Sequence, residues 1–64
     1  MKLNLDKKFY NPSSVEKVVE IFRDNGFDEL SLKEEKDKVI VDGFEDEKIK
    51  GEFLNFLAAQ KSKD

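Results

Sequence analysis

The sequence predicts a small α+β domain in which three strands and two helices follow one another in the order β-α-β-β-α. Two segments carry apolar residues at helical spacing, and three short segments alternate apolar with polar residues. The chain of 64 residues is long enough for one domain, which we expect to span residues 1–64. The predicted architecture has two layers, like half of a split βαβ fold. Its three-stranded antiparallel sheet has the order first, third, second, and both helices lie on one face.

The first strand is predicted over residues 2–9. Leu3 and Leu5 alternate with polar residues, and Phe9 continues the same face. Lys7 interrupts this face, and a lysine in such a position is typical of a sheet edge, where it discourages the addition of another strand. We expect Phe9 in the core and Tyr10 half-buried beside it; the alternative is that Phe9 and Tyr10 form a lip that binds a partner.

The first helix is predicted over residues 12–25. Its apolar residues are three or four positions apart and share one face: Val15, Val18, Val19 and Phe22. Gly26 suits the left-handed conformation that ends many helices, and Phe27 can supply the apolar contact that accompanies such an end.

Two different residues can cap the start of this helix. Asn11 can be the cap, with Pro12 at the first helical position. Alternatively, Ser13 can be the cap and form a capping box with Glu16. The sequence leaves both possibilities open.

Two further strands are predicted over residues 28–33 and 38–42. Leu30 and Leu32 alternate with polar residues, and a polar loop then leads to the apolar run 39–41. We place the second of these strands in the centre of the sheet because it is the most apolar. A right-handed crossover through the first helix makes the two outer strands parallel to each other.

The second helix is predicted over residues 46–61, with Asp46 as its cap. The residues expected to face inward are Ile49, Phe53, Phe56, Leu57 and Gln60. Gly51 is unusual because glycine inside a helix costs about 1 kcal/mol relative to alanine. We expect it to allow the close approach of the sheet or the first helix, or else of a partner. Asn55, one turn later, requires a hydrogen-bond partner.

Both helices are expected to cover the sheet face that carries most of the apolar strand residues. These residues are Leu3, Leu5, Leu30, Leu32, Val39 and Val41. The opposite face is predicted to be mostly polar and open to water, with Ile40 as its apolar exception.

The composition excludes several classes of function. The chain has no cysteine and no histidine, which removes disulfides, thiolate nucleophiles and the usual zinc sites. We therefore expect no enzymatic activity, catalytic residue, metal site or cofactor. The net charge is −3 and basic residues are interleaved with acids, which argues against nucleic-acid binding. No apolar run is long enough for a membrane span or an export signal, so we expect a cytoplasmic protein that does not bind membranes.

Four residues are candidates for contact with a protein or peptide partner: Tyr10, Ile40, Gly51 and Asn55. Tyrosine is enriched at interfaces, and Ile40 is apolar on a polar face. The open edges of a three-stranded sheet can also accept a strand from a peptide, although charged residues along residues 28–33 argue for protection of that edge.

The last helix carries a motif that resembles the C-terminal signature of the HxsD-like family. The motif is Glu47-x-x-x-Gly51-Glu52-Phe53-Leu54-Asn55-Phe56-Leu57-Ala58-Ala59-Gln60. The entry Tyr10-Asn11-Pro12 and the order of elements are also similar. Members of this family are small proteins associated with radical SAM peptide-maturation systems of the His-Xaa-Ser type. The resemblance implies an accessory protein without catalytic activity, whose partner is a radical SAM maturase or its precursor peptide.

The expected function is therefore that of a non-enzymatic binding or accessory protein in peptide modification. The alternative is a structural module that forms a homodimer through the second helix or the open sheet face. The expected oligomeric state is a monomer or a weak homodimer.

Overall fold

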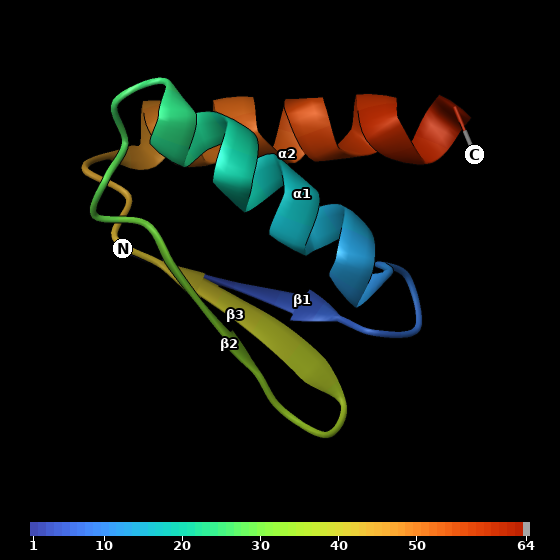
Figure 1. Ribbon diagram of the computed structural model, residues 1–64. Coiled ribbons are helices and arrows are strands. Elements are labelled where there is room, and N and C mark those ends of the chain that lie inside the picture. The colour runs from blue at the N-terminus through green and yellow to red at the C-terminus, as the bar shows by residue number, and fades with distance from the viewer. Residues whose placement is uncertain (64) are drawn as a thin grey trace.

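A computed structural model describes the backbone of residues 1–63 and the side chains of residues 1–60. The chain forms strand β1 (Lys2–Asp6), helix α1 (Pro12–Asp24), strands β2 (Ser31–Glu34) and β3 (Lys38–Asp42), and helix α2 (Glu47–Lys63). Figure 1 shows both helices on the same side of the sheet. This arrangement confirms the predicted α+β class and the order of elements.

The sheet has the order β1-β3-β2, with β3 antiparallel to both neighbours. In the register of the sheet, Leu3 pairs with Val41 and Leu5 with Val39. On the other side of β3, Leu32 pairs with Val41. These residues point to one face, which the helices cover, as the alternation in the sequence predicts.

The core is made of apolar side chains from both helices, from β1 and β3 and from the loops, and the partly buried Leu32 of β2 packs against it. The buried residues are Leu3, Leu5, Val15, Val18, Val19, Phe22, Leu30, Val39, Val41, Phe44, Phe53 and Leu57. Phe53 is fully buried, and its ring meets Phe22 and Phe44 edge to face, each at a centroid distance of 5.2 Å. Phe53 therefore joins both helices to the loop that follows β3.

Specific hydrogen bonds define both ends of α1. Asn11 Oδ1 accepts a hydrogen bond from the backbone N–H of Ser13 at 2.9 Å, so Asn11 is the cap and Ser13 is not. At the other end Gly26 has a φ of +105°, as expected. Phe27 N–H donates to the Phe22 carbonyl at 3.1 Å, and the two rings lie 5.5 Å apart. This is the Schellman arrangement with its apolar contact.

The predicted boundaries differ from the structure most at the first strand. β1 ends at Asp6 and not at residue 9, because Asp6 reverses the chain. Its carbonyl accepts the N–H groups of Phe9 and Tyr10, each at 3.0 Å, and its carboxylate accepts that of Lys8 at 2.8 Å. An aspartate that bonds the backbone two residues on is a turn former. Phe9 is consequently 62% exposed, and the prediction that it lies in the core is wrong.

Smaller differences occur elsewhere. β2 begins at Ser31 and not at residue 28, although Leu30 just before it is buried. α1 ends one residue before the predicted end at residue 25. Asp46 caps α2 as expected, since its carboxylate accepts the N–H of Ile49 at 3.0 Å.

Candidate binding surface

The four candidate contact residues lie in three separate places. Tyr10 is in the loop between β1 and α1, Ile40 is in the middle of β3, and Gly51 and Asn55 are on α2. Tyr10 packs against the core, whereas Asn55 is exposed. The structure therefore does not unite the four residues into one site.

Gly51 lies on the side of α2 that faces away from the sheet. A Cβ atom built at Gly51 would meet no neighbouring atom within 4 Å, among the described residues. The expectation that Gly51 lets the sheet or α1 come close is therefore wrong. Asn55 lies on the same outward side, one turn further on.

Ile40 is half-buried on the open sheet face, between Asn4 of β1 and Lys33 of β2. The other residues on this face are Lys2, Asp6, Ser31, Lys38 and Asp42. Ile40 is thus a single apolar side chain in a polar and charged surface. The apolar area that it exposes is far smaller than the apolar patches that mark interfaces.

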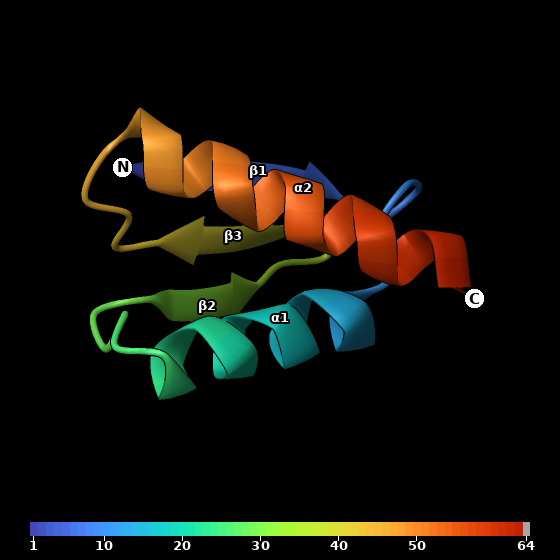
Figure 2. The same ribbon diagram turned by 90° about the horizontal axis from the view of Figure 1, so that it is seen from above.

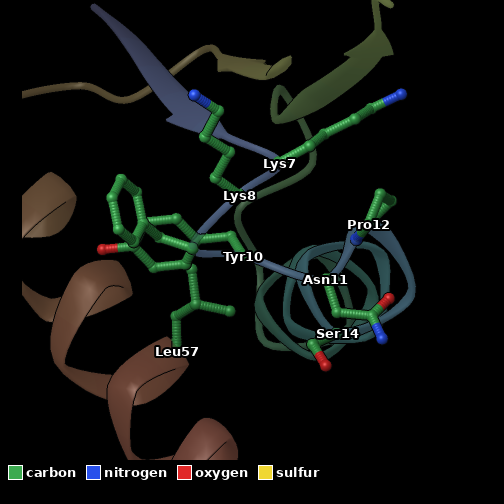
Figure 3. Close-up of a pocket in the computed structure, with 8 residues that line it drawn as sticks. Lys7, Lys8, Tyr10, Asn11, Pro12, Ser14 and Leu57 are labelled. Atoms are coloured by element: carbon green, nitrogen blue, oxygen red, sulfur yellow. The ribbon is translucent and has the colours of Figure 1, made fainter. Parts of the chain in front are cut away.

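The loop between β1 and α1 borders an open pocket of about 550 Å³, here called the β1–α1 pocket. It is lined by Lys7, Lys8, Phe9, Tyr10, Asn11, Pro12, Ser14 and Leu57. Figure 3 shows the ring of Tyr10 turned toward α2, where Leu57 lies, while Lys7 and Lys8 extend away from the ring.

The position of the pocket follows from the length of α2. The helix has 17 residues and the strands have four or five, so its last turns extend past the end of the sheet (Figure 2). The loop between β1 and α1 lies near this extension. Leu57 is 1% exposed and closes the inner wall of the pocket.

The lining of the β1–α1 pocket combines aromatic and cationic groups. Phe9 presents a large exposed ring, and Tyr10 is half-buried behind it. The ammonium group of Lys7 pairs with the Glu34 carboxylate at 2.9 Å, whereas Lys8 is exposed to solvent. Such a surface can bind a segment that offers an apolar side chain next to a carboxylate.

Lys7 does not protect the edge of β1 as the sequence predicted, because it lies beyond the end of the strand. Its backbone N–H donates to the Asp37 carbonyl at 3.0 Å, and its side chain reaches Glu34. Lys7 therefore ties the loop after β1 to the hairpin between β2 and β3.

The sequence does not single out Lys8 as a surface residue of this site, and its pattern favours Phe9 in the core over a contact role. A usable signal was present, since Asp6, Lys7 and Lys8 are three charged residues in succession and Asp6 is a turn former. The alternation of Leu3, Leu5 and Phe9 favours a longer strand instead.

A second hollow, of about 460 Å³, lies at the end of α1 and is lined by Glu20, Arg23, Asp24 and Asp28. These side chains are exposed, and no group of three acidic residues within residues 1–63 is arranged to hold a metal ion. All charged side chains of residues 1–60 are at least partly exposed. The arrangement of charges therefore identifies no second site.

No helix in the described chain combines the length and the apolar character that crossing a membrane requires. Comparison with protein-family models, curated proteins and solved structures finds no match to this chain. The resemblance to the HxsD-like family stays a prediction from the motif in the last helix.

Proposed function

We propose that the protein is a non-enzymatic binding module whose β1–α1 pocket takes a short segment of a protein or peptide partner. One observation carries the proposal: Phe9 is 62% exposed at the mouth of an open pocket walled by Tyr10 and Leu57. Aromatic side chains in such positions supply much of the binding energy of protein interfaces.

The charges near the pocket indicate the chemistry of the partner segment. Lys8 is exposed beside Phe9, whereas the ammonium group of Lys7 is already paired with the Glu34 carboxylate. A partner with a carboxylate next to an apolar side chain would satisfy both features. Because Lys8 is solvated, its contribution is screened by salt, and binding should weaken as ionic strength rises.

The resemblance to the HxsD-like family supports a particular class of partner. A precursor peptide or a radical SAM maturase is therefore the first candidate partner to test. The expected compartment for this interaction is the cytoplasm. A radical SAM gene next to the gene for this chain would support this assignment directly.

A titration of the isotope-labelled protein followed by NMR tests the proposal. The probes are the blocked peptide Glu-Asp-Leu-Phe-Glu-Asp and its counterpart with lysine in place of every acid. We expect the acidic peptide to shift the amide signals of Lys8, Tyr10 and Leu57, and the basic peptide to leave them in place. Failure of the acidic peptide to shift these signals would contradict the proposed chemistry.

Two matched variants test whether the peptide binds at the β1–α1 pocket or at another surface. Phe9→Ser should abolish the shifts, whereas Ile40→Thr, on the opposite sheet face, should preserve them. Circular dichroism of both variants checks that each is folded. If Ile40→Thr weakened binding more than Phe9→Ser, the open sheet face would be the binding surface.

The alternative function, a homodimerisation module, gains little support from the open sheet face, because Ile40 is surrounded there by polar and charged residues. The outer edge of β1 is better suited to self-association.

A further inference from the structure

The outer edge of β1 is open. β1 is an end strand of the sheet, so one of its sides pairs with β3 and no strand within residues 1–63 pairs with the other. An open edge presents unpaired backbone N–H and C=O groups that can bind another strand. The edge at β2 differs, because α1 packs beside β2 (Figure 2).

β1 has few of the features that protect an edge. It has no proline and no charged side chain on its buried face, where Leu3 and Leu5 lie, and its two charged residues, Lys2 and Asp6, lie on the open face. The lysine that could have served as protection, Lys7, lies beyond the strand. β1 can therefore accept a partner strand along its whole length.

The sequence of β1 is complementary to itself in the antiparallel direction. If two copies pair with Asn4 opposite Asn4 of the second copy, Lys2 lies opposite Asp6 and Leu3 opposite Leu5. Opposite charges and apolar pairs facing each other across strands stabilise a sheet. A shift of two residues in either direction loses both Lys2–Asp6 pairs, and a shift of one places polar side chains on the apolar face.

The register between β1 and β3 within each copy extends this charge pattern across the paired sheets. Within one copy, Asp42 lies opposite Lys2, and Lys38 lies opposite Asp6. Across four strands the row would read Asp42, Lys2, then Asp6 and Lys38 of the second copy. The charges alternate in sign along the entire row, so charge complementarity favours a second copy of this chain over an arbitrary peptide.

The helix layer is compatible with this arrangement. An antiparallel pair of edges is related by a two-fold axis perpendicular to the sheet, which keeps all four helices on one face. Phe56 marks the α1 side of α2, since its ring meets Phe22 at a centroid distance of 5.9 Å. Leu54, about 200° around the helix from Phe56, is half-buried on the flank toward the β1 edge. A second α2 across the axis would cover it.

We propose that two copies of this chain associate through their β1 edges, in the register centred on Asn4, to form a continuous six-stranded sheet. The inference is independent of the proposed function, because it uses neither Phe9 nor the β1–α1 pocket.

Cysteine cross-linking tests the register, and the chain is suited to it because it contains no cysteine. Asn4→Cys places a thiol on the two-fold axis, where paired residues have Cβ atoms about 4.5–5.5 Å apart. Lys33→Cys is the matched control, because Lys33 occupies the corresponding position on the opposite edge of the sheet. Both side chains are exposed, so neither substitution disturbs the core.

Under mild oxidation at millimolar protein, we expect Asn4→Cys to form a disulfide-linked dimer at least about tenfold faster than Lys33→Cys. Equal rates would overturn the proposal, and a faster reaction of Lys33→Cys would place the contact at the β2 edge.

Sedimentation of the unmodified chain from micromolar to millimolar concentration provides the second measurement. We expect a concentration-dependent dimer that Lys2→Glu weakens by about tenfold, because it replaces two attractive pairs with repulsive ones. A strict monomer at all concentrations overturns the proposal. Loss of the dimer in Phe9→Ser but not in Lys2→Glu would also overturn it and place self-association at the pocket.

Discussion

The ring of Phe53 in α2 meets the ring of Phe22 in α1 edge to face, at a centroid distance of 5.2 Å and an interplanar angle of 65°. The contact fixes how the two helices lie against each other over the sheet. In a chain of 64 residues without disulfides, a few such contacts supply much of the core.

Phe53→Ala should lower the free energy of unfolding by about 3–5 kcal/mol, because it opens a cavity where a fully buried ring contacts both Phe22 and Phe44. Phe56→Ala is the control, and its cost should be about 1–2 kcal/mol because Phe56 is 38% exposed. Urea unfolding measures both. Equal losses would mean that Phe53 is not the centre of the core.

Gly51→Ala should raise the free energy of unfolding by about 0.5–1 kcal/mol. The added methyl group meets no atom within 4 Å, and alanine loses less backbone entropy than glycine on forming a helix. Thermal unfolding at low protein concentration measures the effect. A loss of stability would show that something does approach Gly51 closely.

Gly43→Ala should be the most harmful glycine substitution, with a cost of at least about 2 kcal/mol. Gly43 has a φ of +100°, and a Cβ atom there would collide with the backbone carbonyl of Glu29. Gly26→Ala is the control for the backbone angle alone, because Gly26 has a similar φ but open space around it; it should cost about 1 kcal/mol. Parallel urea titrations compare the two, and a smaller loss for Gly43→Ala would contradict the close approach.

Asn11→Ala should cost about 1 kcal/mol, because it removes the oxygen that accepts the Ser13 N–H at the start of α1. Ser13→Ala should change stability by less than about 0.5 kcal/mol, since Ser13 is exposed and does not cap the helix. The two variants can be compared by denaturant midpoint. A larger loss of stability in Ser13→Ala than in Asn11→Ala would show that Ser13 caps the helix.

Much of the architecture was accessible from local patterns. The stripe from Val15 to Phe22 and the alternation of Leu3 with Leu5 identify which face of each element is buried. Gly26 and Asp46 mark helix ends through their own backbone and side-chain preferences. The order of the strands followed from the apolar character of residues 39–41 and the handedness of the crossover.

The candidate binding surface was less accessible. The sequence indicates Tyr10 as a contact residue, but its alternating pattern predicts that Phe9 lies in the core. Its exposure depends on whether Asp6 extends the strand or turns it, and both are locally reasonable. The Asp6 turn is observed together with a backbone bond from Lys7 to Asp37, which is distant in sequence.

The sequence by itself determined the α+β class, the order of elements, the apolar face of each element and the positions of Gly26 and Asp46 at helix ends, because these depend on spacing and conformational preference within a few neighbouring residues. The tertiary structure alone decided that Gly43 must lack a side chain, that Gly51 lies in open space and that Phe9 faces solvent beside Leu57. Each of these depends on which atoms of a distant segment come near, and no local pattern contains that information.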